Sequence, residues 1–97
     1  MFKLKFTPQA KEDLEELKNN PALKKRYKAV IKTLGLLSKD PKHPGLNSHK
    51  YKSEKGPNGE QVFEVYAENN TPAAYRIFWC FGPSQGFITI IAITAHP

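Results

Sequence analysis

The sequence predicts a single α+β domain, with a four-stranded, mainly antiparallel sheet and a helical hairpin packed on one of its faces. A chain of 97 residues suits one domain, because two domains would each be near the lower limit for burying a core. One alternating segment is followed by two amphipathic helix patterns and then by three β-rich segments with short turns. Strands joined by short turns pair antiparallel, and the helical hairpin covers one sheet face. We expect the other face to be open and to offer a binding site.

The first elements are a short strand and a helix. Residues 2–6, FKLKF, alternate apolar and basic side chains, which is the period of a strand with one buried face. Thr7 and Pro8 match a helix N-cap followed by proline at the first helical position, where its missing N–H costs nothing. Residues 10–17 then carry apolar side chains four and three positions apart, as one face of a helix does.

A second helix is predicted between Asn20-Pro21, which repeats the cap signal, and Asp40-Pro41, which ends it. Its apolar side chains recur four and three positions apart, at Leu23, Tyr27, Val30, Leu34 and Leu37. Five lysines lie within one quadrant beside this stripe: Lys24, Lys25, Lys28, Lys32 and Lys39. Because the connection between the two helices is short, they should form an antiparallel hairpin.

The rest of the chain predicts a long loop and three strands. Residues 40–60 are dominated by proline, glycine, asparagine, lysine and histidine, and a loop this long is usually functional or disordered. The predicted strands are 61–67, 73–81 and 87–94, with turns at 69–72 and 82–86. We therefore expect an antiparallel meander after the loop.

Positive charge is concentrated in the middle third of the chain. The 15 basic and 9 acidic residues give a net charge of +6. Residues 24–55 hold ten basic and two acidic side chains, a net of +8, whereas residues 1–23 sum to zero and residues 56–97 to −2. A concentrated basic patch favours polyanions such as nucleic acid, so Lys24, Lys25, Lys28 and Lys32 are candidate RNA contacts. A solubilising surface is the alternative.

Several classes of protein are excluded. The single cysteine, Cys80, rules out an internal disulfide and a cysteine-based zinc site, and it favours a cytoplasmic setting. The sequence has no P-loop, GxGxxG, nucleophile elbow or HExxH motif, and its three histidines lack metal-ligand spacing. It also lacks the apolar run of about 20 residues that a membrane helix needs. We expect no cofactor, no metal and no membrane.

Metal-free RNA cleavage needs a base, an acid, cations and a ring that holds a splayed nucleotide. Suitable residue types occur in three places. One group ends the long loop: His49, Lys50, Tyr51 and Lys52. Arg76 is the only charged residue of an apolar strand, and His96 follows the last strand. These residues are the candidate RNA-contacting and catalytic groups.

Each candidate also has a purely structural interpretation. Arg76 could be a surface arginine paired with Glu64 of the neighbouring strand, which is worth about 0–1 kcal/mol if exposed. The two loop lysines could be solvated, Tyr51 could anchor the loop on the core, and His96 could simply be a terminal residue. Of the other notable side chains, His43 indicates a turn, Trp79 a core position and Cys80 a thiol without a base.

The layout resembles the RelE/ParE superfamily of toxins from type II toxin–antitoxin modules. The resemblance covers nearly the whole chain. It rests on the opening TPQAKEDLEEL, the segment LLSKDPKHPGLNSHKY after the second helix, the strand AAYRIFW with its embedded arginine, and the final ITIIAITAHP. The resemblance implies a small sheet with a two-helix hairpin. It also implies, for RelE-like members, entry into the ribosomal A site and metal-free attack of a 2′-hydroxyl in mRNA.

By this resemblance, Arg76 matches the family's strand arginine, which contacts the scissile phosphate. Lys50 and Lys52 match the basic segment where a base or phosphate clamp sits, and His96 lies where the family places its C-terminal acid or base. The chain departs from the family in having only one arginine there and no C-terminal tyrosine or trailing helix. Glu64 could be a general base only if its strand register places it on the side of Arg76.

Three functional hypotheses follow. The first is the toxin of a toxin–antitoxin module that acts as a ribosome-dependent, metal-independent mRNA endoribonuclease and inhibits translation. The second is a ParE-like toxin that binds DNA gyrase without catalysis. The third is an inactive nucleic-acid-binding member of the family. Either toxin implies a cognate antitoxin, for which we expect an acidic amphipathic segment that complements the basic surface.

Overall fold

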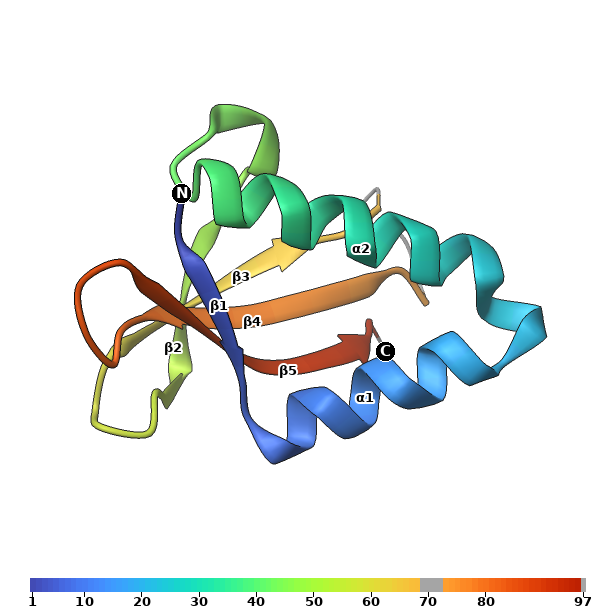
Figure 1. The fold of residues 1–97 in the computed structure, drawn as a ribbon, viewed down its shortest axis with the longest axis horizontal. Helices are drawn as coiled ribbons and strands as arrows, with labels where there is room; N and C mark the ends of the chain where they lie inside the picture. The colour runs from blue at the N-terminus through green and yellow to red at the C-terminus, as the bar shows by residue number, and fades with distance from the viewer. Residues whose placement is uncertain (69–72, 97) are drawn as a thin grey trace.

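The protein, described from a computed structural model, forms two layers, with both helices on one side of a twisted sheet (Figure 1). The structure describes residues 1–68 and 73–96. The elements, in chain order, are β1 (Lys3–Phe6), α1 (Pro8–Asn19), the 3-10 turn η1 (Pro21–Leu23), α2 (Lys24–Lys39), the 3-10 turn η2 (Pro44–Leu46), β2 (His49–Lys55), β3 (Gln61–Tyr66), β4 (Tyr75–Phe81) and β5 (Phe87–Ala95). The predicted α+β class with a helical hairpin on one face is confirmed.

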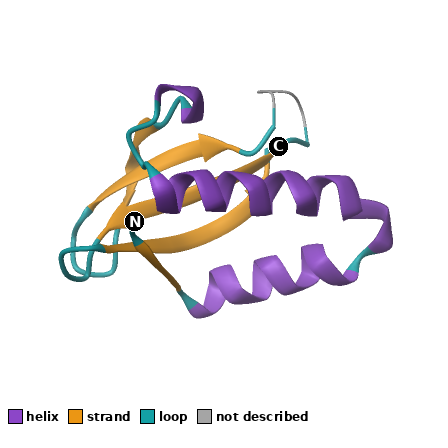
Figure 2. Ribbon diagram, turned by 45° about the horizontal axis from the view of Figure 1, so that its top comes forward, coloured by secondary structure: helices purple, strands orange, loops and turns teal. Residues whose placement is uncertain are grey.

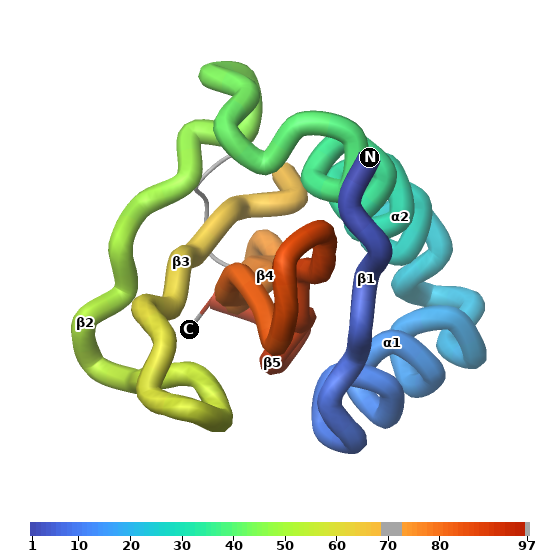
Figure 3. Tube along the Cα trace, turned by 60° about the vertical axis from the view of Figure 1, so that its left-hand side comes forward, coloured from blue at the N-terminus to red at the C-terminus, as the bar shows by residue number. Residues whose placement is uncertain are grey.

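The sheet has five strands rather than the predicted four, in the order β1-β5-β4-β3-β2. β1 pairs parallel with β5, and the other neighbours pair antiparallel. The additional strand is β2, within the segment 40–60 that was expected to be a loop. Figure 3 shows β2 at the sheet edge furthest from β1. Its sequence, HKYKSEK, has one aromatic residue and no aliphatic ones, because an edge strand can remain largely exposed and rich in lysine.

The helix boundaries follow from their caps. The Thr7 side chain accepts a hydrogen bond from the N–H of Ala10 at 3.1 Å, and proline occupies the first turn, as predicted. The Asn20 side chain also forms a cap, but it caps the 3-10 turn η1. The helix α2 therefore begins at Lys24, three residues later than predicted. The two helices then run antiparallel, side by side (Figure 2). The helix ends at Lys39, as the following Asp-Pro pair predicts.

The three predicted strands of the meander are confirmed to within one or two residues at each end. The turn between β4 and β5 is also confirmed. It uses Gly82 and Gly86 at φ of 111° and 85°, a region that side chains disfavour, and the N–H of Gly82 donates to the Phe87 carbonyl at 3.0 Å. The predicted turn at 69–72 lies outside the described residues.

The hydrophobic core lies between the helices and the sheet. It comprises Ala10, Leu17, Val30, Leu34, Leu37, Leu46, Val65, Ile77, Trp79, Ile88, Ile90 and Ile93. Trp79 is 2% exposed, which confirms its predicted core position. Because side chains alternate along a strand, burial of Ile77 and Trp79 under the helices sends Arg76 and Phe78 to the other, uncovered face. None of the helices among the described residues has the length and apolar character needed to cross a membrane.

Replacement of Leu37 by alanine should destabilise the fold by about 2–5 kcal/mol, because the side chain is fully buried between α2 and the sheet. Ile31 on the same helix is 42% exposed, so Ile31→Ala is the matched control, expected to change stability by about 0.5 kcal/mol or less. Urea unfolding of both variants measures the difference. Equal stabilities would contradict this assignment of the helix face.

Candidate functional site

The sheet register brings four residues discussed in the sequence analysis to the face without helices: His49, Tyr51, Glu64 and Arg76. The Cα of Arg76 faces that of Tyr66 in β3 and that of Thr94 in β5. In the adjacent row, Glu64 of β3 lies between His49 of β2 and Phe78 of β4. Residues paired across an antiparallel sheet point to the same face, so both rows share the side of Arg76. We call this surface, formed by His49, Tyr51, Glu64, Tyr66, Arg76, Phe78 and Thr94, the open face.

Arg76 and Glu64 form the central ion pair of the open face. Nη1 of Arg76 donates to Oε2 of Glu64 at 3.1 Å, and Nη2 donates to the Thr94 hydroxyl at 3.5 Å. The side chains are only 18% and 14% exposed, so solvent screens the pair weakly. Nε of Arg76 is buried and has no hydrogen-bond partner among residues 1–68 and 73–96. Glu64 therefore forms the ion pair with Arg76 that the sequence suggested. It also lies on the same side of the sheet as Arg76, which its use as a general base would require.

Aromatic rings line one side of this ion pair. The guanidinium carbon of Arg76 lies 4.9 Å from the centre of the Phe78 ring, a cation–π distance. The ring of Tyr51 is tilted against Phe78 with centres 4.7 Å apart. Tyr51 is half-buried, so it anchors β2 on the sheet and still presents part of its ring beside the ion pair.

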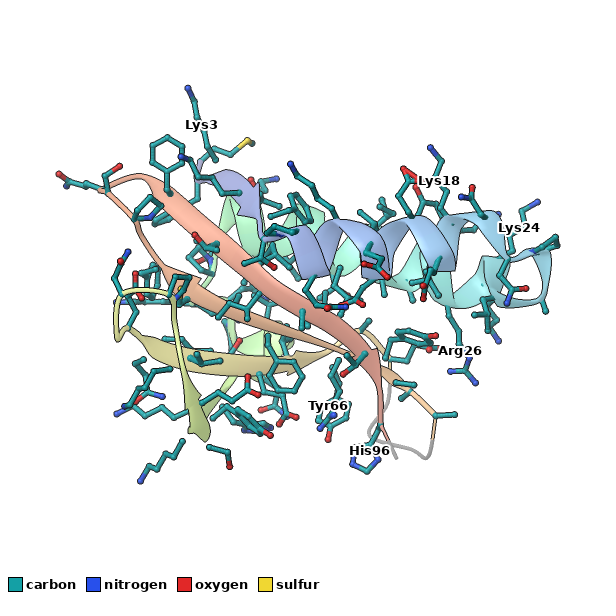
Figure 4. The ribbon with its side chains drawn as sticks, turned by 90° about the horizontal axis from the view of Figure 1, so that it is seen from below. Lys3, Lys18, Lys24, Arg26, Tyr66 and His96 are labelled. Carbon is teal, nitrogen blue, oxygen red and sulfur yellow. The ribbon has the colours of Figure 1, made fainter. Side chains whose placement is uncertain are left out.

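Imidazoles lie on two sides of the ion pair. His49 is exposed and is paired with Glu64 across β2 and β3. His96 follows β5, where its N–H donates to the Ala74 carbonyl at 2.7 Å and its ring lies 5.7 Å from the Tyr66 ring. Figure 4 shows Tyr66 and His96 next to each other at this end of the sheet. The Cα of Tyr66 faces that of Arg76, so Tyr66 lies between His96 and Arg76.

Sequence reasoning did not propose three residues of the open face: Tyr66, Phe78 and Thr94. For Tyr66 a signal was available, because the alternation in QVFEVY places Val62, Glu64 and Tyr66 on one side of a strand. His43, in contrast, behaves as predicted for a turn residue, since its Nδ1 accepts a hydrogen bond from the N–H of Gly45 at 2.9 Å.

Most of the predicted lysines are not brought to the open face. Lys50 is exposed and is paired with Phe63, whose ring packs on the core, so it points to the side of β2 opposite His49 and Tyr51. Lys52 is exposed where the β2–β3 register is irregular. The four helix lysines are exposed on α2, in the layer behind the sheet: Lys24, Lys25, Lys28 and Lys32. The basic middle third therefore surrounds the domain instead of gathering over Arg76.

Cys80 shares the side of Arg76 but is fully buried. Burial and, to a smaller extent, the Glu60 carboxylate raise the pKa of its thiol to about 11, from the usual 9.0. This rise in the pKa makes the thiolate about a hundredfold scarcer at pH 8. We therefore expect Cys80 in the folded protein to react with a disulfide reagent at least a hundredfold more slowly than in protein unfolded in urea. Absorbance of the released thiol measures both rates. Comparable rates would show that Cys80 is accessible and ionised.

The arrangement can combine charge stabilisation with proton transfer. A carboxylate that already contacts a guanidinium can accept a proton, and its neutralisation then leaves the cation to interact with another anion. Imidazole can donate or accept a proton near neutral pH. Within the described part of the chain, His, Cys, Asp and Glu side chains do not gather in groups of three that could hold a metal ion.

Comparison with solved structures identifies the fold. The chain has the fold of the RelE/ParE toxins, which confirms at the level of fold the resemblance seen in the sequence. A YoeB/ParE toxin from Agrobacterium tumefaciens superposes with a TM-score of 0.71 at 14% identity, covering 99% of this chain and 100% of that one. RelE in the archaeal RelE–RelB complex from Pyrococcus horikoshii gives 0.64 at 15% identity, with 97% and 93% covered.

The E. coli RelBE toxin–antitoxin complex gives a TM-score of 0.64 at 12% identity, covering 100% of this chain and 99% of the matched one. No protein-family model and no curated protein sequence matches the chain. The likeness therefore lies in the arrangement of the elements and extends over the whole domain, whereas the side chains have diverged widely.

Proposed function

We propose that this chain is the toxin of a toxin–antitoxin module and that it cleaves mRNA on the ribosome without a metal ion. The observation that carries the proposal is the Arg76–Glu64 pair at 3.1 Å on the open face, bordered by aromatic rings and by two histidines. The fold shared with RelE and YoeB/ParE toxins supports the toxin class.

In the proposed reaction, the 2′-oxygen of one nucleotide attacks the adjacent phosphorus, and the bond from phosphorus to the 5′-oxygen breaks. Glu64 takes the proton of the 2′-hydroxyl. Its charge is then neutralised, so Arg76 loses its ionic partner at the moment when the phosphate gains negative charge. The geometry thus links deprotonation of the nucleophile to stabilisation of the transition state.

The leaving 5′-oxygen needs a proton, and His96 is the proposed donor because it borders the row of Arg76 through Tyr66. His49 and Tyr51 are the proposed contacts for the splayed nucleotides, since both lie on the open face and an exposed ring edge suits base stacking. Lys50 and Lys52 are exposed on the edge strand β2, and Lys50 points away from the open face, so they are proposed to hold the RNA backbone along the sheet edge and not at the reacting phosphate.

The lysines of α2 are proposed to attract the protein to ribosomal RNA rather than to touch the scissile phosphate. Replacing Lys24, Lys25, Lys28 and Lys32 together by alanine should therefore lower kcat/KM about tenfold at moderate ionic strength and leave kcat unchanged. Steady-state cleavage at several salt concentrations measures both constants. A loss of kcat at saturating ribosomes would instead place these lysines in the reaction.

A ParE-like toxin that binds DNA gyrase is the second candidate. This candidate is favoured by the ion pair itself, because the Glu64 carboxylate already neutralises the charge of Arg76. The exposed lysines do not take part in this pair. Such a surface can bind a partner without chemistry. In either case a cognate antitoxin with an acidic amphipathic segment is the proposed partner, in keeping with the RelE–RelB and RelBE complexes that share the fold.

The two candidates are distinguished by a short induction of the chain in a bacterial host. The nuclease predicts translation arrest, with new mRNA 5′ ends inside codons and intact chromosomal DNA. Gyrase binding predicts the reverse, with DNA breaks that disappear in a host whose gyrase is resistant. Normal growth with folded protein and neither lesion would favour the inactive nucleic-acid-binding alternative.

A further inference from the structure

A groove lies in the helix layer, between α1 and α2. It has a volume of about 370 Å³, which is within the range of binding clefts. Its apolar lining comes from three elements, with Phe6 from β1, Leu14 from α1 and Tyr27 from α2. All three side chains pack against the core but are only half-buried, so part of each is available to a partner. We call this surface the hairpin groove.

Lysines form the α1 side of the hairpin groove. Lys11 and Lys18 line it, and both are exposed. Each lysine directly follows a buried residue, Ala10 or Leu17, and one residue turns an α-helix by roughly 100°. The two lysines therefore lie on the flank of α1, a quarter turn from the side that packs on the sheet.

The α2 side continues both the apolar lining and the lysines. Residues three or four positions apart on a helix are neighbours, so Lys24 and Ile31 lie on the same side of α2 as Tyr27. Ile31 is 42% exposed, an unusual exposure for a large apolar side chain. Lys28 is exposed and neighbours both Lys24 and Ile31 by the same spacing. Figure 4 shows Lys18 and Lys24 at the same end of the helix layer.

The hairpin groove carries unbalanced positive charge. Its two sides hold four lysines, Lys11, Lys18, Lys24 and Lys28. Glu15 is the one carboxylate in the lining, so four positive charges and one negative charge give a net of +3. The ion pairs between described residues use Arg26 and Arg76, so none of these four ammonium groups is paired with a described carboxylate. An anionic partner would therefore meet cations on both sides of an apolar floor.

We propose that the hairpin groove binds an acidic amphipathic helix of a partner protein. The apolar side chains of that helix would enter the groove, and its carboxylates would face the lysines on both sides. Because α1 has 12 residues and a length of about 18 Å, a partner helix of about three to four turns matches it. A nucleic-acid backbone fits less well, since the aliphatic side chains of Leu14 and Ile31 offer nothing to a phosphate.

The identity of this partner rests on the proposed function, in which the acidic helix belongs to the antitoxin. The hairpin groove lies in the helix layer, whereas Arg76 and Glu64 lie on the other face of the sheet, so the bound helix would leave their ion pair uncovered. It would instead occupy Lys24 and Lys28, two of the lysines proposed to attract ribosomal RNA. The antitoxin would thus inhibit the toxin by preventing its approach to the ribosome.

A synthetic acidic peptide tests the groove without ribosomes. The probe has about 15 residues, with leucines at four-three spacing, glutamates on both flanks of that stripe and alanine elsewhere. Fluorescence anisotropy of a labelled peptide measures binding. We expect saturable binding, and control peptides in which glutamine replaces every glutamate, or alanine every leucine, should bind about tenfold more weakly. Binding of the probe by a chain that leaves mRNA intact would support the groove while rejecting the nuclease.

Variants locate the binding. Lys18→Glu should weaken binding of the probe about fivefold or more, because it places a carboxylate beside those of the peptide. Ile31→Ala should weaken binding about threefold through the loss of apolar contact. Lys55→Glu is the matched control, since it changes the net charge equally but lies on β2, and it should leave the affinity within about twofold.

Amide resonances show which surface is occupied. With bound probe, those of Leu14 and Tyr27 should shift, while those of Glu64 and Arg76 should stay in place; the reverse pattern would overturn the proposal. Absence of binding at about 1 mM probe would overturn it too. Equal binding of the leucine-free peptide, or an equal effect of the two lysine substitutions, would also overturn it, because the surface would then recognise charge alone, as in contacts with RNA phosphates.

Discussion

Replacement of Arg76 by alanine is expected to lower mRNA cleavage by about 10²–10³-fold, the usual cost of removing a group that stabilises transition-state charge. Arg76 is the one cation held on the open face by described contacts, through Glu64 at 3.1 Å and Thr94 at 3.5 Å. Arg76→Lys should recover little, because an ammonium cannot keep both contacts in one plane. Single-turnover cleavage at saturating protein measures the loss.

The fold offers a matched control for this substitution. Arg26 forms the second ion pair between described residues, with Glu68 at 2.9 Å, and it comes from α2 in the helix layer, whereas Arg76 comes from the sheet. Arg26→Ala should leave single-turnover cleavage within about twofold of the original. Thermal unfolding of both variants checks that they are folded, since the Arg76 change also leaves the Glu64 carboxylate buried without its partner. Equal cleavage by the two variants would remove Arg76 from the reaction.

Replacement of Glu64 by glutamine is expected to have the second large effect on mRNA cleavage. The amide keeps the size of the side chain but cannot take the 2′-hydroxyl proton, so kcat should fall by about 10²–10⁴-fold. Binding should not weaken, because the neutral amide no longer competes with the phosphate for the Arg76 guanidinium. We therefore expect an unchanged or lower KM together with the loss of kcat.

The separation of the two constants makes the Glu64 test specific. If the carboxylate only holds Arg76 in place, Glu64→Gln would keep a hydrogen bond to it and retain most of kcat. Steady-state cleavage measures kcat and KM for both proteins. Retention of most of the original kcat in Glu64→Gln would exclude Glu64 as the base.

Much of the fold could be predicted from local patterns. The FKLKF alternation, the Thr-Pro cap and the four-three spacing on α2 each identify an element, because each element buries one face of its own. β2 could not be found this way. As an edge strand it buries little, so its residues carry no apolar alternation, and its pairing with β3 depends on long-range contacts.

The site was predictable only in part, for a related reason. The arginine stood out because it interrupts an apolar strand, and its pairing with Glu64 needed only the neighbouring strand. Whether the lysines lie near Arg76 depends on how the helix layer is placed relative to the sheet, which local sequence patterns do not reveal. Residues 24–55 form one basic block in the sequence, but the sheet separates the lysines on α2 from the side that carries Arg76. Sequence proximity therefore overstated the charge near the candidate site.

The most direct test of the central claim is the chemistry of the cleaved ends. Ribosomes programmed with a short mRNA are incubated with the purified chain, and a second mRNA carries a single 2′-deoxy nucleotide before the cleavage position. We predict a 2′,3′-cyclic phosphate and a 5′-hydroxyl from the first mRNA, no cleavage of the deoxy mRNA, and loss of cleavage in Arg76→Ala but not in Arg26→Ala. Intact mRNA with folded protein, or cleavage that persists without the 2′-hydroxyl, would contradict the account.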